Sequence, residues 1–220
     1  MKRKTMLKRR YLIFLIGLVL TAFGVAIVTK GALGTSPIAA IPYSLSLVVP
    51  IFSMGTWVVL FNVLLVAIQW LILKKEANRI ELLLQVVMSF IFGYGVDFWM
   101  LVIHNVDPKV YGTKLLCLLI GSAILAFGAY LEVTADVVML PGDGFVRACT
   151  TLVNKEFGTV RVMSDIGMSV IAAIICFVGL HRLAGVREGT IIAALLVGNL
   201  VKFYVRSLKK LSAFMIPEDK

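Results

Sequence analysis

Charged side chains are scarce in this chain. Asp, Glu, Lys and Arg together make up 15% of its 220 residues, whereas 60% of the residues are apolar. A soluble domain of this length needs far more polar surface to cover its core, and the mean hydropathy of +0.98 shows the same shortage. The composition therefore excludes an ordinary soluble protein and predicts an integral membrane protein.

Cysteine and histidine are also rare, with three and two copies. Cys117, Cys149 and Cys176 are odd in number, and their spacing suits no metal site. We therefore expect small buried hydrophobic residues rather than disulfides. The chain also lacks a nucleophile–base pair, a phosphate loop and a metal-ligand spacing. We expect no enzyme activity, no cofactor and no metal.

Long apolar runs, in contrast, are abundant. Because about 20 helical residues cross the hydrocarbon core, the sequence predicts an all-α, polytopic transmembrane bundle with six crossings. The first run is long and lacks a persuasive cleavage site, so we expect a retained helix rather than a signal peptide. The last run is short and could continue as an interfacial segment. The six runs are residues 11–28, 56–73, 80–103, 115–138, 160–180 and 190–205.

The net charge of +10 follows membrane topology rather than a nucleic-acid motif. With the N-terminus inside, 17 of the 22 basic residues fall in inner segments. This bias matches the positive-inside rule and the anionic inner leaflet. We expect both termini to be cytoplasmic, with a basic N-terminus at residues 1–10 and a tail at residues 206–220. The expected partner is the lipid bilayer, and no nucleic acid is expected.

The chain contains a weak internal repeat that divides it into residues 11–103 and 115–205. Each part holds three crossings, so the second part enters the membrane from the opposite side. The sequence thus predicts a 3+3 inverted-topology repeat, an arrangement shared by many secondary transporters. The matching positions are residues 16–24 with 120–128, Pro37 with Pro141, and Gly55-Thr56 with Gly158-Thr159.

Each half has a break after its first crossing, followed by an apolar segment too short to span the membrane. These segments are residues 38–49 and 145–157, and a proline precedes each one. Thr35 or Ser36 is expected to cap the first segment, and Asp143 the second. A half-helix that begins inside the membrane presents free N–H groups and a partial positive charge. Re-entrant half-helices and helices lying in the interface both fit these segments.

Ionisable groups inside a predicted crossing are costly, so each is a candidate for solute or ion binding. Glu132 and Asp136 are four residues apart and continue the glycine face of the fourth crossing. These two carboxylates could bind a cation or exchange a proton. Alternatively, they could lie near the inner mouth and pair with Arg147 or Arg161.

Polar residues in the other crossings complete the candidate set. Asp165 occupies the position at which the first half has Asn62, so the two could line a central cavity or hold the breaks. Asp97 is a candidate for an outer gate or interface contact, Glu188 for an outer helix cap, and Asn199 for a bond between helices. The candidate solute- or ion-binding residues are Thr35, Ser36, Asn62, Asp97, Glu132, Asp136, Asp143, Asp165, Glu188 and Asn199.

Several segments carry a resemblance to a known family, and residues 187–192 (REGTII) are the most specific. The others are Gly24 with residues 30–37, Gly55-Thr56 with the helix that follows, Asp165, and Val197-Gly198. Together they resemble the YczE/YitT-type bacterial membrane proteins over nearly the whole chain. YitT-type members often carry an added soluble C-terminal domain, so this chain is closer to the YczE type. The resemblance implies an inner-membrane protein suspected of transport, with no binding residue to carry over.

Secondary transport of a small polar solute by alternating access is the function that these observations favour. The half-helix starts at residues 35–37 and 141–144 would contact an anionic group of the solute. Glu132, Asp136 and Asp165 would supply a site for a coupling proton or cation. The small size and small-residue helix faces make a homodimer an expected partner. The alternatives are an accessory protein that docks a partner without transport, and a channel.

Overall fold

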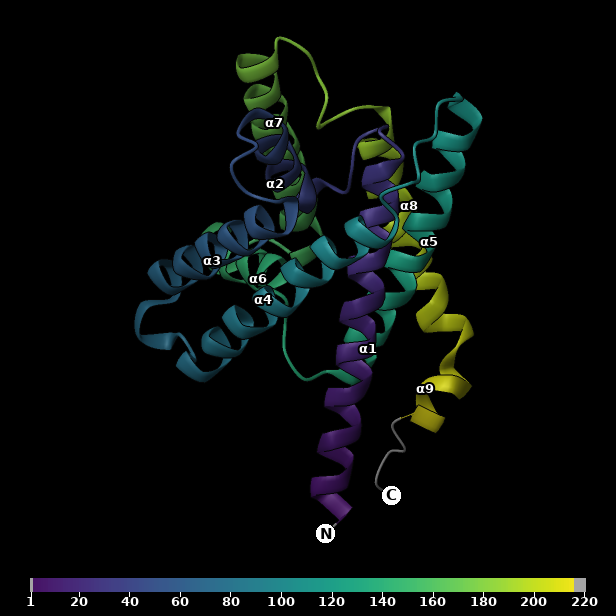
Figure 1. The fold of residues 1–220 in the computed structure, drawn as a ribbon. Coiled ribbons are helices and arrows are strands. Elements are labelled where there is room, and N and C mark those ends of the chain that lie inside the picture. The colour runs from purple at the N-terminus through teal and green to yellow at the C-terminus, as the bar shows by residue number, and fades with distance from the viewer. Residues whose placement is uncertain (1, 216–220) are drawn as a thin grey trace.

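The computed structural model describes residues 2–215, and all regular structure in this part of the chain is helical (Figure 1). Six of the helices, α1, α3, α4, α5, α7 and α8, are long and apolar enough to cross a membrane. The predicted all-α fold with six candidate spans is therefore confirmed. The elements are α1 (Lys2–Lys30), α2 (Pro37–Val48), α3 (Met54–Leu73), η1 (Lys74–Glu76), α4 (Arg79–Val102), α5 (Tyr111–Ala135), α6 (Pro141–Val153), α7 (Phe157–Leu180), α8 (Glu188–Ser207) and α9 (Lys209–Met215).

The helices fall into two groups, which α4 joins because it packs both on α1 and on α3 (Figure 1). In the core group, α1 packs on α5, α4 packs on α1, and α8 packs on α5. In the arm group, α2 and α6 each pack on both α3 and α7. The largest contact between the groups is that of α3 with α4. We call the end at which α1 begins and α9 ends the terminal end, and the opposite end the far end (Figure 1).

Four glycines allow α1 and α5 to touch backbone to backbone. A Cβ on Gly24 would lie 2.7 Å from the carbonyl oxygen of Gly121. A Cβ on Gly128 would lie 2.7 Å from the carbonyl oxygen of Gly17. The order of these contacts shows that the two helices run antiparallel. In a membrane, where apolar side chains gain little by leaving lipid, such close approach is a main source of helix association.

The two breaks have the same local structure. Ala32 follows α1 with φ of 52°, and Asp136 follows α5 with φ of 47°. Each break then leads to a proline at the first position of a short helix, Pro37 in α2 and Pro141 in α6. Proline suits that position because its missing N–H has no partner there in any helix. The arrangement of the halves as an inverted repeat stays a prediction.

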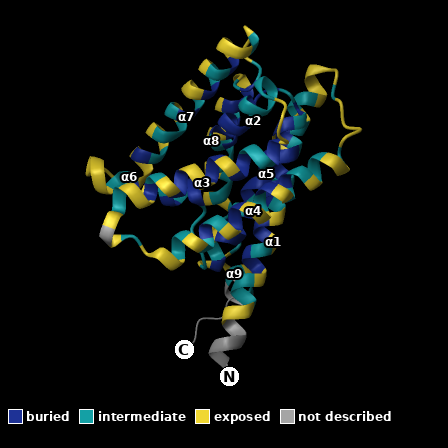
Figure 2. Ribbon diagram, turned by 60° about the vertical axis from the view of Figure 1, so that its left-hand side comes forward, coloured by how far each residue is buried: buried dark blue, intermediate teal, exposed yellow. Residues whose placement is uncertain are grey.

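Both short helices begin in the interior and end at the surface. Ala40 in the first turn of α2 is fully buried, whereas Ile51, just beyond its end, is 79% exposed. In α6, Gly144 is buried and Leu152 is exposed. Figure 2 shows the buried residues gathered in the middle of the bundle and the exposed residues along the outer faces and outer ends of the helices. The short helices therefore enter the bundle with their N-termini first.

Helix α1 begins at Lys2 rather than at residue 11, and two boundaries at the second break also differ from those expected. The second short helix spans Pro141–Val153 rather than residues 145–157, with Leu140 and not Asp143 at its N-cap. The fourth crossing ends at Ala135, and Asp136 adopts a left-handed conformation beyond it. Aspartate tolerates that conformation better than most residues. Asp136 is therefore exposed outside the helix and does not continue the glycine face of Glu132.

The glycine contact makes a direct prediction. Gly24→Ala should destabilise the protein by about 1–3 kcal/mol, because the new Cβ overlaps the backbone of α5 and the helices must separate. Gly112→Ala is the control, since a Cβ on that residue of α5 meets nothing within 4 Å. Thermal unfolding of the purified proteins in detergent measures the difference. Equal melting temperatures for the two variants would contradict the close α1–α5 contact.

Candidate solute site at the half-helix starts

The starts of α2 and α6 meet inside the bundle. The side chain of Ile38 lies directly against Gly142 and occupies the place that a Cβ there would take. Ser36, at the N-cap of α2, does not bond the helix start through its side chain. Its hydroxyl is buried and has no hydrogen-bond partner among the described residues. We call residues 35–38 and 140–144 the half-helix junction.

The far end of the molecule supports the first break. The backbone N–H of Gly189 donates to the carbonyl of Leu33 at 2.8 Å, and the Arg187 guanidinium donates to the carbonyl of Ala32 at 3.2 Å. Gly34, with φ of 101°, lies against the buried hydroxyl of Thr190. The REGTII segment therefore holds the first break in place, and we call it the REGTII brace. Glu188 pairs with Arg187 at the exposed rim, at 3.2 Å.

Two buried glutamines hold the start of α6. The Gln69 side-chain amide donates to the Gln85 side-chain oxygen at 3.0 Å and to the carbonyl of Pro141 at 3.1 Å. Both glutamines are almost completely buried, and Gly144 lies against their amide groups without room for a Cβ. Sequence reasoning missed this pair, since the polar residues that it selected inside the crossings were the acids and two asparagines. Two amides within apolar runs were the available signal.

A polar cavity of about 230 Å³ leads to this amide pair. Its deep end is formed by Gln69, Gln85 and Gly144, whereas Glu76, Asn78 and Arg147 at its rim are exposed. The cavity thus runs from the α3–α4 connection to the start of α6. The remaining lining residues are Leu73, Glu81, Leu82, Met139, Ala148 and Thr151.

One arginine joins two predicted site acids. The Arg161 guanidinium pairs with Asp143 at the start of α6, and its Nε lies 3.4 Å from Oδ2 of Asp165 on α7. All three side chains are partly buried, from 25% to 40% exposed. The cluster carries one positive and two negative charges and ties the half-helix junction to α7.

Glu132 lies in the core group instead. Its carboxylate accepts a hydrogen bond from the Thr21 hydroxyl at 2.7 Å, and its Cγ lies 3.0 Å from the position of a Cβ on Gly17. The side chain is 8% exposed. The structure therefore separates Glu132 from Asp165 and from the exposed Asp136. The predicted trio of acids does not form one site.

The other predicted site residues have local roles. Asp97 on α4 accepts hydrogen bonds from the backbone N–H of Gly55 at 2.7 Å and from the Ser53 hydroxyl, so it stabilises the positive start of α3. The Thr35 hydroxyl is buried 3.3 Å from that of Thr29. Asn62 is buried on α3, and exposed Asn199 donates to the carbonyl of Leu195 in its own helix at 2.8 Å.

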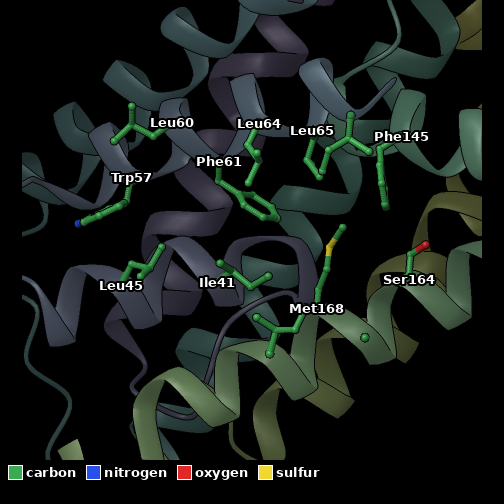
Figure 3. A pocket seen from close by; sticks show the side chains of 13 residues that line it. Ile41, Leu45, Trp57, Leu60, Phe61, Leu64, Leu65, Phe145, Ser164 and Met168 are labelled. Atoms are coloured by element: carbon green, nitrogen blue, oxygen red, sulfur yellow. The ribbon is translucent and has the colours of Figure 1, made fainter. Parts of the chain in front are cut away.

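A larger hollow of about 470 Å³ lies between α3 and α7 (Figure 3). Side chains such as Phe61, Leu65 and Met168 form its walls, and Ser164 is its one polar side chain. Leu60 and Leu64 at its edge are about half exposed, so in a membrane this groove faces lipid. It offers no charge or amide to a polar solute, whereas the smaller cavity does.

The arginine cluster makes a second prediction. Arg161→Gln leaves Asp143 and Asp165 facing each other without a cation, so it should destabilise the protein by about 1–3 kcal/mol. The triple variant Asp143→Asn/Arg161→Gln/Asp165→Asn should recover part of that loss, because no charge is left unpaired. Thermal unfolding in detergent distinguishes the two. A triple variant less stable than Arg161→Gln alone would contradict the cluster.

Comparisons with known proteins find one family and one curated relative, and neither has an assigned function. The chain is 27% identical over 135 residues to the uncharacterized protein YyaS of Bacillus subtilis (strain 168). The matched residues make up 61% of this chain and 65% of that relative. No solved structure matches. The resemblance to the YczE/YitT type stays a prediction. A family model matches residues 8–206, and the chain therefore belongs to the family of unknown function DUF6198.

Proposed function

We propose that this protein is a secondary transporter that moves a small polar solute across a bacterial inner membrane by alternating access. The observation that carries the proposal is the polar cavity that ends at a buried half-helix start. Irregular backbone inside a membrane is tolerated where it is buried in protein or lines a water-filled cavity. Broken helices at such a cavity are a common way for transporters to bind solutes.

The chemistry of the cavity sets the kind of solute. Its volume of about 230 Å³ is below the roughly 300–1,000 Å³ of sites for drug-sized ligands, so the solute is small. The amides of Gln69 and Gln85 offer both a donor and an acceptor. The partial positive charge at the start of α6 attracts an anionic group. Arg147 at the rim adds a cation, beside Glu76 and Glu81.

Reciprocal contacts support the inverted repeat that alternating access uses. Phe23 on α1 lies 4.3 Å from Trp99 on α4, between ring centroids. Their counterparts, Phe127 on α5 and Tyr204 on α8, lie 5.6 Å apart. The glycine contacts of α1 with α5 are reciprocal as well. A two-fold relation between halves of opposite orientation would produce such pairs.

Glu132 is the residue that we assign to ion or proton coupling. It is the one acidic side chain among the described residues that is more than nine-tenths buried, and carboxylates in that position generally serve a pathway or a relay. Cytoplasmic termini and a homodimer belong to the proposal as well. No enzyme activity and no cofactor are part of it.

A transport assay with a matched pair of variants tests the proposal. A thermal-shift screen of amino acids, vitamins and amines first identifies a stabilising compound, and counterflow of that compound is then measured in proteoliposomes. Gln85→Leu should reduce uptake at least tenfold, because the buried amide that faces the solute is lost. Asn199→Leu removes an amide from the exposed face of α8 and should leave uptake unchanged.

The other functions give different results. Unsaturable bulk conductance would indicate a channel. No uptake of any stabilising compound, together with a partner that co-purifies stoichiometrically, would favour the accessory function. Equal uptake by Gln85→Leu and the wild type would contradict the assignment of the cavity.

A further inference from the structure

The arm group packs on the core group mainly through α3 and α4, with smaller contacts of α2 with α8 and of α6 with α4. At the far end, α3 packs closely on α4: a Cβ on Gly93 would lie 2.5 Å from the carbonyl oxygen of Gly55, and Val59 packs on the same glycine. Asp97 adds its two hydrogen bonds to the start of α3.

The corresponding contact between α7 and α8 is open. A Cβ on Gly158 or on Gly198 would meet nothing within 4 Å. The helices are joined at the far end by residues 181–187, and they make no contact comparable to that of α3 with α4. Glu156 and Lys202, near the terminal end, are both exposed and form no ion pair among the described residues.

The facing positions of α7 and α8 correspond in the repeat to those that join α3 to α4. Glu156 is the N-cap of α7, as Ser53 is the N-cap of α3. Gly198 corresponds to Gly93 in the repeat, and Lys202 corresponds to Asp97. Where Ser53 meets Asp97 in the first half, the second half would therefore bring a carboxylate to an ammonium group. Glu156 and Lys202 carry opposite charges, so they would attract each other if α7 approached α8.

Within the core group, α8 already packs on α5 in the way that α4 packs on α1. α8 packs on α5 through Phe127 and Tyr204, as α4 packs on α1 through Phe23 and Trp99. The tyrosine hydroxyl of Tyr130 further ties α5 to the end of α8 by donating to a backbone carbonyl at 3.2 Å. The missing contact therefore results from the position of α7 and not from a displaced α8.

We propose that the arm group rocks on the core group, so that α7 closes on α8 as α3 leaves α4, and that an ion pair between Glu156 and Lys202 latches the closed terminal end. The inference rests on the proposed transport, since it supplies the second of the two access states. An exposed ion pair contributes little stability. That makes it suitable for a latch that must open again in every cycle.

Cross-linking of matched cysteine pairs tests the rocking motion. In a background with Cys117, Cys149 and Cys176 changed to Ala, Ser53→Cys/Asp97→Cys should form a disulfide at the far end under copper phenanthroline in proteoliposomes. Glu156→Cys/Lys202→Cys should form one at the terminal end. With all four cysteines, each molecule should form one disulfide and retain two thiols reactive toward maleimide-PEG.

The outcomes that overturn the inference are distinct. Quantitative cross-linking of the 53/97 pair with no cross-linking of the 156/202 pair would exclude the closed terminal end. Two disulfides in one molecule would exclude alternation. These cross-linking readouts need no solute. If the predicted cross-links fail while uptake is intact, the rocking motion is contradicted and the transport function is not. Alternating disulfides without uptake of any compound would support the motion and contradict transport.

The latch has its own test. In the Val162→Cys/Gly198→Cys variant, whose positions correspond to the contact of Val59 with Gly93, disulfide formation reports closure. Glu156→Lys or Lys202→Glu should lower the cross-linked fraction about two- to fivefold, as expected for an exposed ion pair. The double charge swap should restore it. If the cross-linked fraction of the double charge swap is as low as that of either single change, the ion pair is contradicted.

Discussion

The satisfaction of free backbone groups inside an apolar molecule is the constraint on which the rest of this structure depends. The breaks before α2 and α6 bring backbone groups without helical partners into the bundle, where lipid offers no partner. Gln69 donates to the carbonyl of Pro141 at the start of α6, and Arg187 and Gly189 donate to the carbonyls of Ala32 and Leu33 in the break before α2. Gln69, with its partner Gln85, also lines the cavity in which the proposed solute would bind.

The core group keeps these starts in place. Because α1 and α5 touch through glycines, the two chain breaks that follow them are fixed relative to each other. The prolines then direct both short helices inward from the breaks. The arm group, built around those helices, contacts the core group mainly through α3 and α4. A rigid core and an arm held on one side are the mechanical basis of the proposed cycle.

Much of this fold was accessible from the sequence. Hydrophobic run length predicted five of the six long helices to within four residues at each end, because crossing a bilayer fixes the length of a helix. The exception is α1, which begins at Lys2 rather than at residue 11. The repeat located both prolines and both short helices. The partners of polar residues were not accessible, since they depend on which helices meet: Arg161 pairs with Asp143 and Asp165 rather than with Glu132. Asp136 was misplaced because a left-handed residue ended its helix earlier than hydropathy indicated.

Proximity of the two half-helix starts tests the central claim most directly. The Ile38 Cγ1 atom lies 3.3 Å from the position of a Cβ on residue 142, so a sulfur at that place can reach a cysteine there. In the cysteine-free background, Ile38→Cys/Gly142→Cys should form a disulfide in the membrane without added oxidant, and Ile38→Cys alone should stay reduced. Two free thiols in the double variant, both labelled by a membrane-impermeant maleimide, would contradict the account.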